Sequence, residues 1–184
     1  MVGLCAISPE ACSRRFRGHS RLRWKVIGMH VELSRTYPVP RHRGFEYFMD
    51  VRSWTDWTTM DIVDREAAVW ENPGDKMRYT RKTSLPGFPL KGEVVLDEVT
   101  SDELVLMTLT TTGLPVMPVE CRFADAGPGA FTLTLTVHTD DPTGFMWEAL
   151  ERLLFIETLT ARDMRSCLDG LEVLCQRPGM ANPM

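Results

Sequence analysis

The stretch VELSRTYPVPRHRGFEYFMDVRSWTDW, from Val31 to Trp57, decides the fold. Its opening alternates with a period of two, which predicts a half-buried strand. Pro38 and Pro40 end that strand, and Pro40 is well placed to open a helix. The segment from Arg41 to Met49 then predicts a short helix with one apolar side, and a second helical turn is expected around Val51 to Trp54.

Six further strands are expected after this opening. Apolar runs alternate with turn residues such as Asn72-Pro73-Gly74-Asp75. The connections are too short to hold crossover helices, so the sheet must be antiparallel. The expected strands are Met60–Trp70, either continuous or broken near Glu66, and Met77–Thr83, Leu90–Val99, Leu104–Thr112, Pro115–Ala124 and Phe131–Thr139.

A long amphipathic helix is expected at the end of the chain, from about Thr143 to Cys175. Asp140 or Asp141 can cap it, Pro142 suits its first turn, and Arg177-Pro178-Gly179 stop it. Only this helix is large enough to cover the apolar face of the sheet. The sequence therefore predicts an α+β helix-grip fold: a seven-stranded curved antiparallel sheet wrapped around a long C-terminal helix, with two short helices after strand 1. A cavity can remain between sheet and helix.

The bulk properties are those of a soluble globular protein, with 43% hydrophobic and 25% charged residues. The formal net charge of −4 gives no reason to expect a nucleic-acid partner. Neither a span of about 18–20 apolar residues nor a secretory pattern is found, so no stable membrane insertion is expected. The five cysteines are scattered, which predicts reduced thiols and a cytoplasmic location rather than disulfides or a zinc site.

The N-terminal segment differs from the rest of the chain. Residues 1–28 hold six basic residues and one acid, whereas the remainder carries a charge of −9. This segment is either a basic arm that contacts phosphate or an acidic partner, or an extension ahead of a start at Met29. We expect a flexible basic extension over 1–28, a ligand-binding domain over 29–176 and a tail over 177–184.

Three features together resemble the START superfamily, also called SRPBCC or the polyketide cyclase/dehydrase and lipid-transport group. They are the segment from Val31 to Trp57, the Asn72-Pro73-Gly74-Asp75 turn, and the helix end LDGLEVL from Leu168 to Leu174. The likeness covers about residues 30–176 and implies the helix-grip fold with a hydrophobic-ligand cavity. The family includes lipid carriers, hormone receptors, aromatic polyketide cyclases and ligand-binding domains of oxygenases, and it has no shared catalytic set to carry over. The four histidines form no recognisable ligand cluster, so neither a metal nor a cofactor is expected.

Glu157 is the candidate catalytic residue, because it interrupts the inward stripe of the last helix. That stripe contains Met146, Leu150, Leu153, Met164, Leu168 and Leu171. A carboxylate among apolar neighbours finds a partner or stays protonated, and a raised pKa would suit acid/base work or a hydrogen bond to a ligand oxygen. Alternatively, Glu157 forms a structural ion pair with an inward arginine or lies where water enters.

Other residues are candidates for ligand contact. Arg35 and Arg81 share the phase of inward residues, so either guanidinium could face Glu157 or polarise a ligand carbonyl, unless a bulge turns them to water. Methionines suit an adaptable pocket wall or an ordinary core, and Trp57 either closes a cavity mouth or packs the short helices. The predicted ligand-binding residues are Arg35, Tyr37, Trp57, Met60, Met77, Tyr79, Arg81, Met107, Met117, Leu135, Met146, Leu150, Leu153, Glu157 and Met164.

Three functions compete. The first is a carrier or binding protein that holds a small hydrophobic molecule, aromatic polyketide-like or lipid-like, in an internal cavity. The second is a polyketide cyclase or dehydratase in which Glu157 moves protons and Arg35 or Tyr37 stabilises an enolate. The third is an interaction module with a filled core, which the absence of any pocket approaching about 300 Å³ would favour. The oligomeric state is not predicted.

Overall fold

The computed structural model describes residues 30–63, 70–81, 90–114, 116–139 and 156–176. Both the predicted N-terminal extension and the predicted C-terminal tail lie outside these residues. The elements in chain order are β1 (His30–Tyr37), α1 (Arg41–Met49), the 3-10 turn η1 (Val51–Ser53), α2 (Trp54–Trp57), β2 (Met60–Ile62), β3 (Lys76–Arg81), β4 (Leu90–Thr100), β5 (Leu104–Thr111), β6 (Met117–Gly127), β7 (Ala130–His138) and α4 (Ile156–Cys175).

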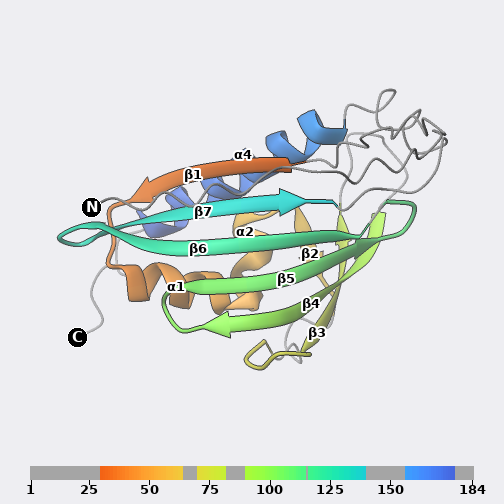
Figure 1. The fold of residues 1–184 in the computed structure, drawn as a ribbon, viewed down its shortest axis with the longest axis horizontal. Coiled ribbons are helices and arrows are strands. Elements are labelled where there is room, and N and C mark those ends of the chain that lie inside the picture. The colour runs from red at the N-terminus through yellow and green to blue at the C-terminus, as the bar shows by residue number, and fades with distance from the viewer. Residues whose placement is uncertain (1–29, 64–69, 82–89, 115, 140–155, 177–184) are drawn as a thin grey trace, which may run out of the picture.

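The seven strands form one antiparallel sheet in the order β1-β7-β6-β5-β4-β3-β2 (Figure 1). Strands β2 to β6 each pair with the next strand in the chain, and β1 pairs with β7 at the edge of the sheet, where His30 lies opposite His138. The turn between β4 and β5 places Asp102 at a φ of 61°, a left-handed conformation that aspartate tolerates. The α+β fold class and the antiparallel seven-stranded sheet are confirmed.

Two irregularities interrupt the ladders, between Leu96 and Glu98 in β4 and between Asp125 and Gly127 in β6. Such bulges bend the strand that carries them. Neither affects β1 or β3, whose registers run without a shift. Arg35 and Arg81 therefore keep the phase of the buried tyrosines on their strands.

Strand β7 shows how the alternating sequence builds the two faces of the sheet. Phe131, Leu133, Leu135 and Val137 are buried, whereas His138 is exposed, as predicted. The threonines between them lie on the other face, where Thr132 and Thr134 bond through their hydroxyls to side chains of β1 at 2.8 Å. The apolar face of β7 is therefore available to line the interior.

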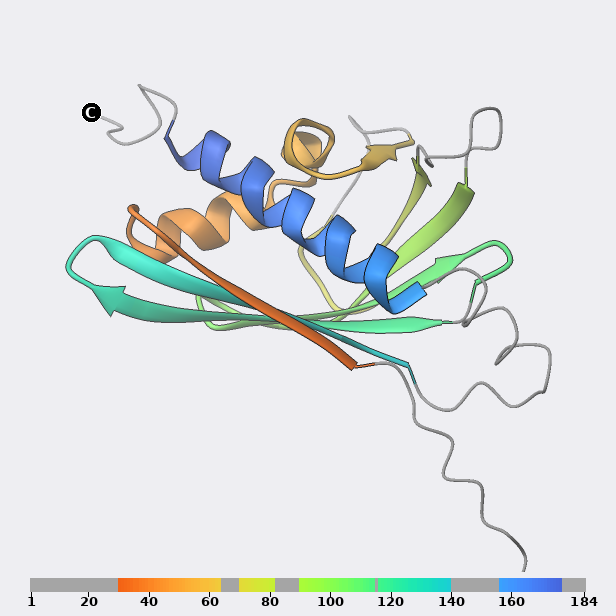
Figure 2. The ribbon, with the colours of Figure 1, turned by 90° about the horizontal axis from the view of Figure 1, so that it is seen from above.

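Helix α4 lies across the inner face of the sheet, on the same side as α1 and α2 (Figure 2). It buries the predicted stripe residues Met164, Leu168 and Leu171, together with Leu174. The part of the predicted helix before residue 156 lies outside the described residues. None of the helices within the described ranges is long and apolar enough to cross a membrane.

Polar contacts from β1 fix the C-terminal half of α4. The Arg35 guanidinium pairs with the carboxylates of Asp169 and Glu172, the latter at 2.8 Å. The Tyr37 hydroxyl donates a hydrogen bond to the carbonyl oxygen of Leu168 at 3.1 Å. Asp169 is 63% exposed and still reaches Arg35.

Helix α1 packs on the sheet through Gly44. A Cβ atom at this position would lie 2.1 Å from the nearest carbon of the Phe131 ring. That ring is fully buried and stacks between Tyr37 and Phe123, with ring centroids 5.0 and 6.0 Å away. Only glycine allows α1 to approach the sheet this closely.

A continuous strand from Met60 to Trp70 is wrong, because β2 ends at Ile62; residues 64–69, where a break was considered, lie outside the described residues. Val63 is in a turn, and Trp70 lies outside any strand. The Trp70 ring is buried and packs edge-on against Trp54, with centroids 5.7 Å apart. Apolar residues at both ends of this segment led to the over-long prediction, since burial of a tryptophan does not require strand pairing.

Candidate functional site

A cavity of about 110 Å³ lies between the inner face of the sheet and helices α2 and α4. The sheet supplies side chains that alternate along β5, β6 and β7: Met107, Leu109, Met117, Val119, Leu135 and Val137. The remaining lining comes from the aromatic residues Phe48, Trp54 and Trp57, the segment from Thr58 to Met60, Arg81, and the α4 residues Thr160, Asp163, Met164 and Cys167. Most of this wall is apolar.

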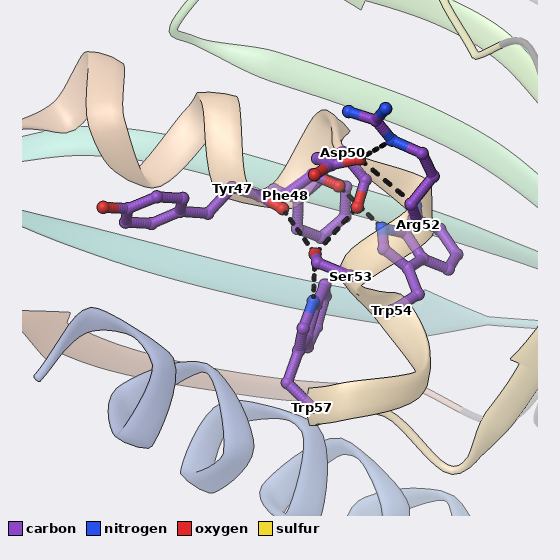
Figure 3. Close-up of polar contacts among 7 residues, drawn as sticks. All are labelled: Tyr47, Phe48, Asp50, Arg52, Ser53, Trp54 and Trp57. Atoms are coloured by element: carbon purple, nitrogen blue, oxygen red, sulfur yellow. Dashed lines mark hydrogen bonds and ion pairs between the residues drawn. The ribbon is translucent and has the colours of Figure 1, made fainter. Parts of the chain in front are cut away.

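Hydrogen bonds hold the aromatic part of the wall in place (Figure 3). The Trp57 indole N–H donates to Ser53 Oγ at 3.2 Å, and that hydroxyl bonds to the carbonyl of Asp50 at 2.7 Å. The Trp54 indole N–H donates to the carbonyl of Phe48 at 2.7 Å. These bonds satisfy both indole nitrogens at the protein side, so the ring surfaces can face the cavity.

The same three rings contact one another. The ring centroids of Phe48 lie 5.7 Å from those of Trp54 and Trp57, and the two tryptophan centroids are 5.9 Å apart. Tilted and edge-to-face arrangements of this kind are favourable for aromatic rings. The aromatic wall is therefore a preorganised surface.

Two charged groups lie in the cavity wall, Arg81 on β3 and Asp163 on α4, and they form an ion pair. The Arg81 side chain is 16% exposed and that of Asp163 is 35% exposed. Burial lowers the pKa of Arg81, but a guanidinium remains charged in proteins. The cavity thus offers an ion pair, with the remaining donors of the guanidinium, at one point of a largely apolar surface.

Cys167 lines the cavity as a protonated thiol. Burial raises its pKa, and a hydrogen bond from the Thr59 N–H and the charge of Arg81 offset only part of that rise. A thiol whose pKa is raised by burial is a poor nucleophile. Cys121, Cys167 and Cys175 are free, as predicted for the described cysteines; the cytoplasmic location stays a prediction.

No group of three or more histidine, cysteine or acidic side chains that could hold a metal ion is found in the part of the chain that the structure describes. The chemistry of the described cavity therefore rests on the Arg81–Asp163 pair, the threonine hydroxyls and the sulfur atoms.

The cavity brings together seven of the residues predicted to bind a ligand. They are Trp57, Met60, Arg81, Met107, Met117, Leu135 and Met164. Trp57 both packs the short helices and lines the cavity, so the two alternatives considered for it coexist. Ligand contact itself stays a prediction for all seven.

Four predicted residues are not part of the cavity lining. Arg35 and Tyr37 contact α4 instead, through the pairs described above. The Tyr79 hydroxyl shares a hydrogen bond of 2.5 Å with Thr111 Oγ1, and Met77 is buried in the core. Arg35 and Tyr37 thus connect β1 to α4, Tyr79 connects β3 to β5, and Met77 fills the core, so none of the four faces the cavity.

The remaining predictions fall where the structure gives no side-chain description. Met146, Leu150 and Leu153 lie outside the described residues. Glu157 belongs to the first turn of α4, but its side chain is outside the description as well. Its acid/base role stays a prediction, and the two inward arginines have other partners in Asp163, Asp169 and Glu172.

Sequence reasoning missed Asp163, Cys167 and the threonines of the lining. A signal for the α4 residues was present, because Thr160, Asp163 and Cys167 lie three to four positions apart and so share one face of a helix. Their polarity concealed it, since the stripe was identified from apolar residues alone. Thr58 and Thr59, in the connection from α2 to β2, carry no comparable pattern.

No protein-family model matches the sequence, and no curated protein matches it either. Solved structures do match. The aromatase/cyclase Zhui from Streptomyces sp. R1128 has 16% sequence identity and a TM-score of 0.65, over 82% of this chain and 95% of that one. A START superfamily protein from Mycobacterium smegmatis has 8% identity and a TM-score of 0.59, over 80% and 97%.

DynU16, a protein of the dynemicin biosynthetic locus, has 15% identity and a TM-score of 0.60; the match covers 84% of this chain and half of DynU16. At such low sequence identity these similarities support the same fold and do not indicate a shared activity. They agree with the element order, the antiparallel sheet and the covering helix described above. The chain has the helix-grip fold of START-like proteins.

Proposed function

We propose that the protein binds a small, largely apolar molecule in the cavity beneath α4, with Arg81 at the polar end of that molecule. The supporting observation is a largely apolar cavity wall that carries one partly buried ion pair, Arg81–Asp163. Burial of an ion pair costs desolvation free energy that the pairing only partly returns. The Arg81 guanidinium would donate a hydrogen bond to an oxygen of the ligand, and such bonds are strong because the donor is charged.

The interior cavity is smaller than the about 300 Å³ of a typical ligand pocket, which by itself favours the interaction module with a filled core. Any ligand is therefore limited to about one aromatic ring. An engineered apolar cavity of about 150 Å³ in another protein binds benzene, and the cavity here measures about 110 Å³. The four methionines of the wall are flexible and polarisable, so they can adapt to a ring. A long acyl chain or several fused rings exceed this volume, which narrows the predicted lipid-like or polyketide-like ligand to a small compound.

A cyclase or dehydratase is the second candidate, favoured by the carboxylate of Asp163 beside the Arg81 guanidinium in a partly enclosed site. The guanidinium would stabilise an enolate oxygen, and a carboxylate would take up and return a proton. Arg81 replaces Arg35 and Tyr37 as the polar partner, because neither of those lines the cavity. Glu157 keeps its acid/base role in this proposal; turnover of a substrate that survives Glu157→Gln would exclude it.

Binding can be followed on the methionine methyl groups. Titration of methyl-labelled protein with toluene should shift the NMR signals of the cavity methionines Met60, Met107, Met117 and Met164. Met77 is buried on the same sheet but lies outside the lining, so its signal serves as an internal control. Cavity methionines that do not respond at millimolar toluene, in a preparation from which native mass spectrometry detects no retained small molecule, would refute the proposal and favour an interaction module with a filled core.

The role of Arg81 can be tested with acetophenone and ethylbenzene, which differ by a carbonyl group. The wild type should bind acetophenone more tightly, and Arg81→Met should remove a preference of roughly tenfold, since a hydrogen bond to a charged group contributes about 1.5 kcal/mol or more. Arg78→Met, on the outer face of the same strand, is the matched control. If the wild type and Arg81→Met showed the same affinity ratio of acetophenone to ethylbenzene, Arg81 would have no binding role and the cavity would be a purely apolar site.

A further inference from the structure

Helix α4 touches helix α2 at Gly170. A Cβ atom at Gly170 would lie 2.4, 2.8 and 3.0 Å from the carbonyl oxygen, Cα and carbonyl carbon of Trp57. All three are backbone atoms, so no side-chain rotation can relieve the contact. The ring of the same Trp57 forms part of the cavity wall.

Gly170 continues the helix face that lines the cavity. Asp163 and Cys167 line it, and Gly170 follows Cys167 after three positions, so the three residues lie on successive turns of one face. Gly170 itself is not part of the lining, and at this position α4 approaches the Trp57 backbone directly. The Gly170–Trp57 contact therefore lies one turn beyond the lining residue Cys167 on the same helix face.

A glycine within a helix is unfavourable relative to alanine, because it has more conformational freedom to lose on folding. Gly170 lies inside a helix of 20 residues that continues for five positions beyond it. A methyl group here would need about 1 Å of separation between α2 and α4 to reach the 3.4 Å of an ordinary contact. That movement would carry the Trp57 ring away from α4.

We propose that Gly170 is a positioning residue that sets the size limit of the cavity through Trp57. This inference rests on the proposed function, since it concerns which ligands the same cavity admits. Trp57 is held from two sides: its backbone rests against Gly170, and its indole N–H bonds to Ser53. Together these contacts fix how far the ring extends into the cavity.

The test measures the affinity ratio of butylbenzene to toluene. The wild type should prefer toluene, and Gly170→Ala should raise the ratio about fourfold, the factor that one additional buried methylene contributes. Ser166→Ala, at an exposed position of the same helix, should leave the ratio unchanged. A change in stability alone would not alter this ratio, so the readout distinguishes positioning from general destabilisation.

Trp57→Phe provides a second test that leaves the Gly170 contact with the backbone intact. It should also raise the ratio, because the smaller ring extends less far into the cavity, and it decides the matter if Gly170→Ala does not fold. An unchanged ratio in a folded Gly170→Ala, or in Trp57→Phe, overturns the inference while binding itself stands. A wild type that binds neither probe overturns the proposed function, and the inference with it.

Discussion

Substitution of Gly44 by alanine sets two opposing effects against each other. Alanine favours a helix over glycine by about 1 kcal/mol, so on propensity alone the variant should be more stable. The new methyl group, however, would lie 2.1 Å from the Phe131 ring, which must move by about 1.3 Å to reach the 3.4 Å of an ordinary contact. The ring stacks between Tyr37 and Phe123 and cannot turn aside without displacing them.

Overpacking of this kind costs about 1–3 kcal/mol. Since two aromatic rings and helix α1 must shift together, we expect a cost of about 3 kcal/mol and a net loss of about 2 kcal/mol for Gly44→Ala. With a urea dependence of about 2 kcal/mol per molar, the midpoint of unfolding should fall by about 1 M. Tryptophan fluorescence during urea unfolding measures this directly.

A second substitution identifies the cause. Phe131→Leu removes the ring that the new methyl group meets, so the double variant should be more stable than the sum of the two single losses, by about 1 kcal/mol or more. His42→Ala, at an exposed position of α1, controls for a change of residue type in the helix. A Gly44→Ala protein as stable as the wild type, or a loss that Phe131→Leu does not relieve, would refute the packing argument.

Two further predictions concern residues at or near the contact between β1 and α4. Tyr37→Phe removes the hydrogen bond to the Leu168 carbonyl and should lower the free energy of unfolding by about 1 kcal/mol; unchanged urea unfolding would show that the bond contributes nothing. Burial and the charge of Glu172 raise the pKa of Cys175 to about 11, from 9.0. The unfolded chain therefore loses this proton first, so stability should fall between about pH 9 and 11, and Cys175→Ala should reduce that fall; identical pH profiles would contradict it.

The sequence predicted those parts of the fold whose side chains repeat with a clear period. Strand β7 and helix α1 were placed to within one residue, because the alternating pattern of the one and the proline boundary of the other act locally. Strand β2 was overestimated, since Trp70 is buried by contact with Trp54 and not by strand pairing. Tertiary contacts of this kind leave no periodic signal.

The candidate site was predicted less completely than the fold. Arg81 was identified from its phase on β3, but its partner Asp163 was not, because the pairing depends on how α4 is rotated over the sheet. Arg35 has the same phase on β1, and it pairs with Asp169 and Glu172 beyond the cavity. Alternation therefore predicts which face a side chain occupies, whereas the position along that face depends on the packing of distant elements.

The ion pairs between the sheet and α4 also limit how the protein can respond to a ligand. Asp163 and Glu172 are separated by nine positions, or about 13 Å along the helix axis, and they pair with arginines on β3 and β1, at opposite sides of the sheet. If α4 slid along the sheet or rotated about its axis, both ion pairs would break together. We therefore expect molecules of different shape to be accommodated mainly by rotamer changes of the methionine side chains, with little movement of α4 along the sheet.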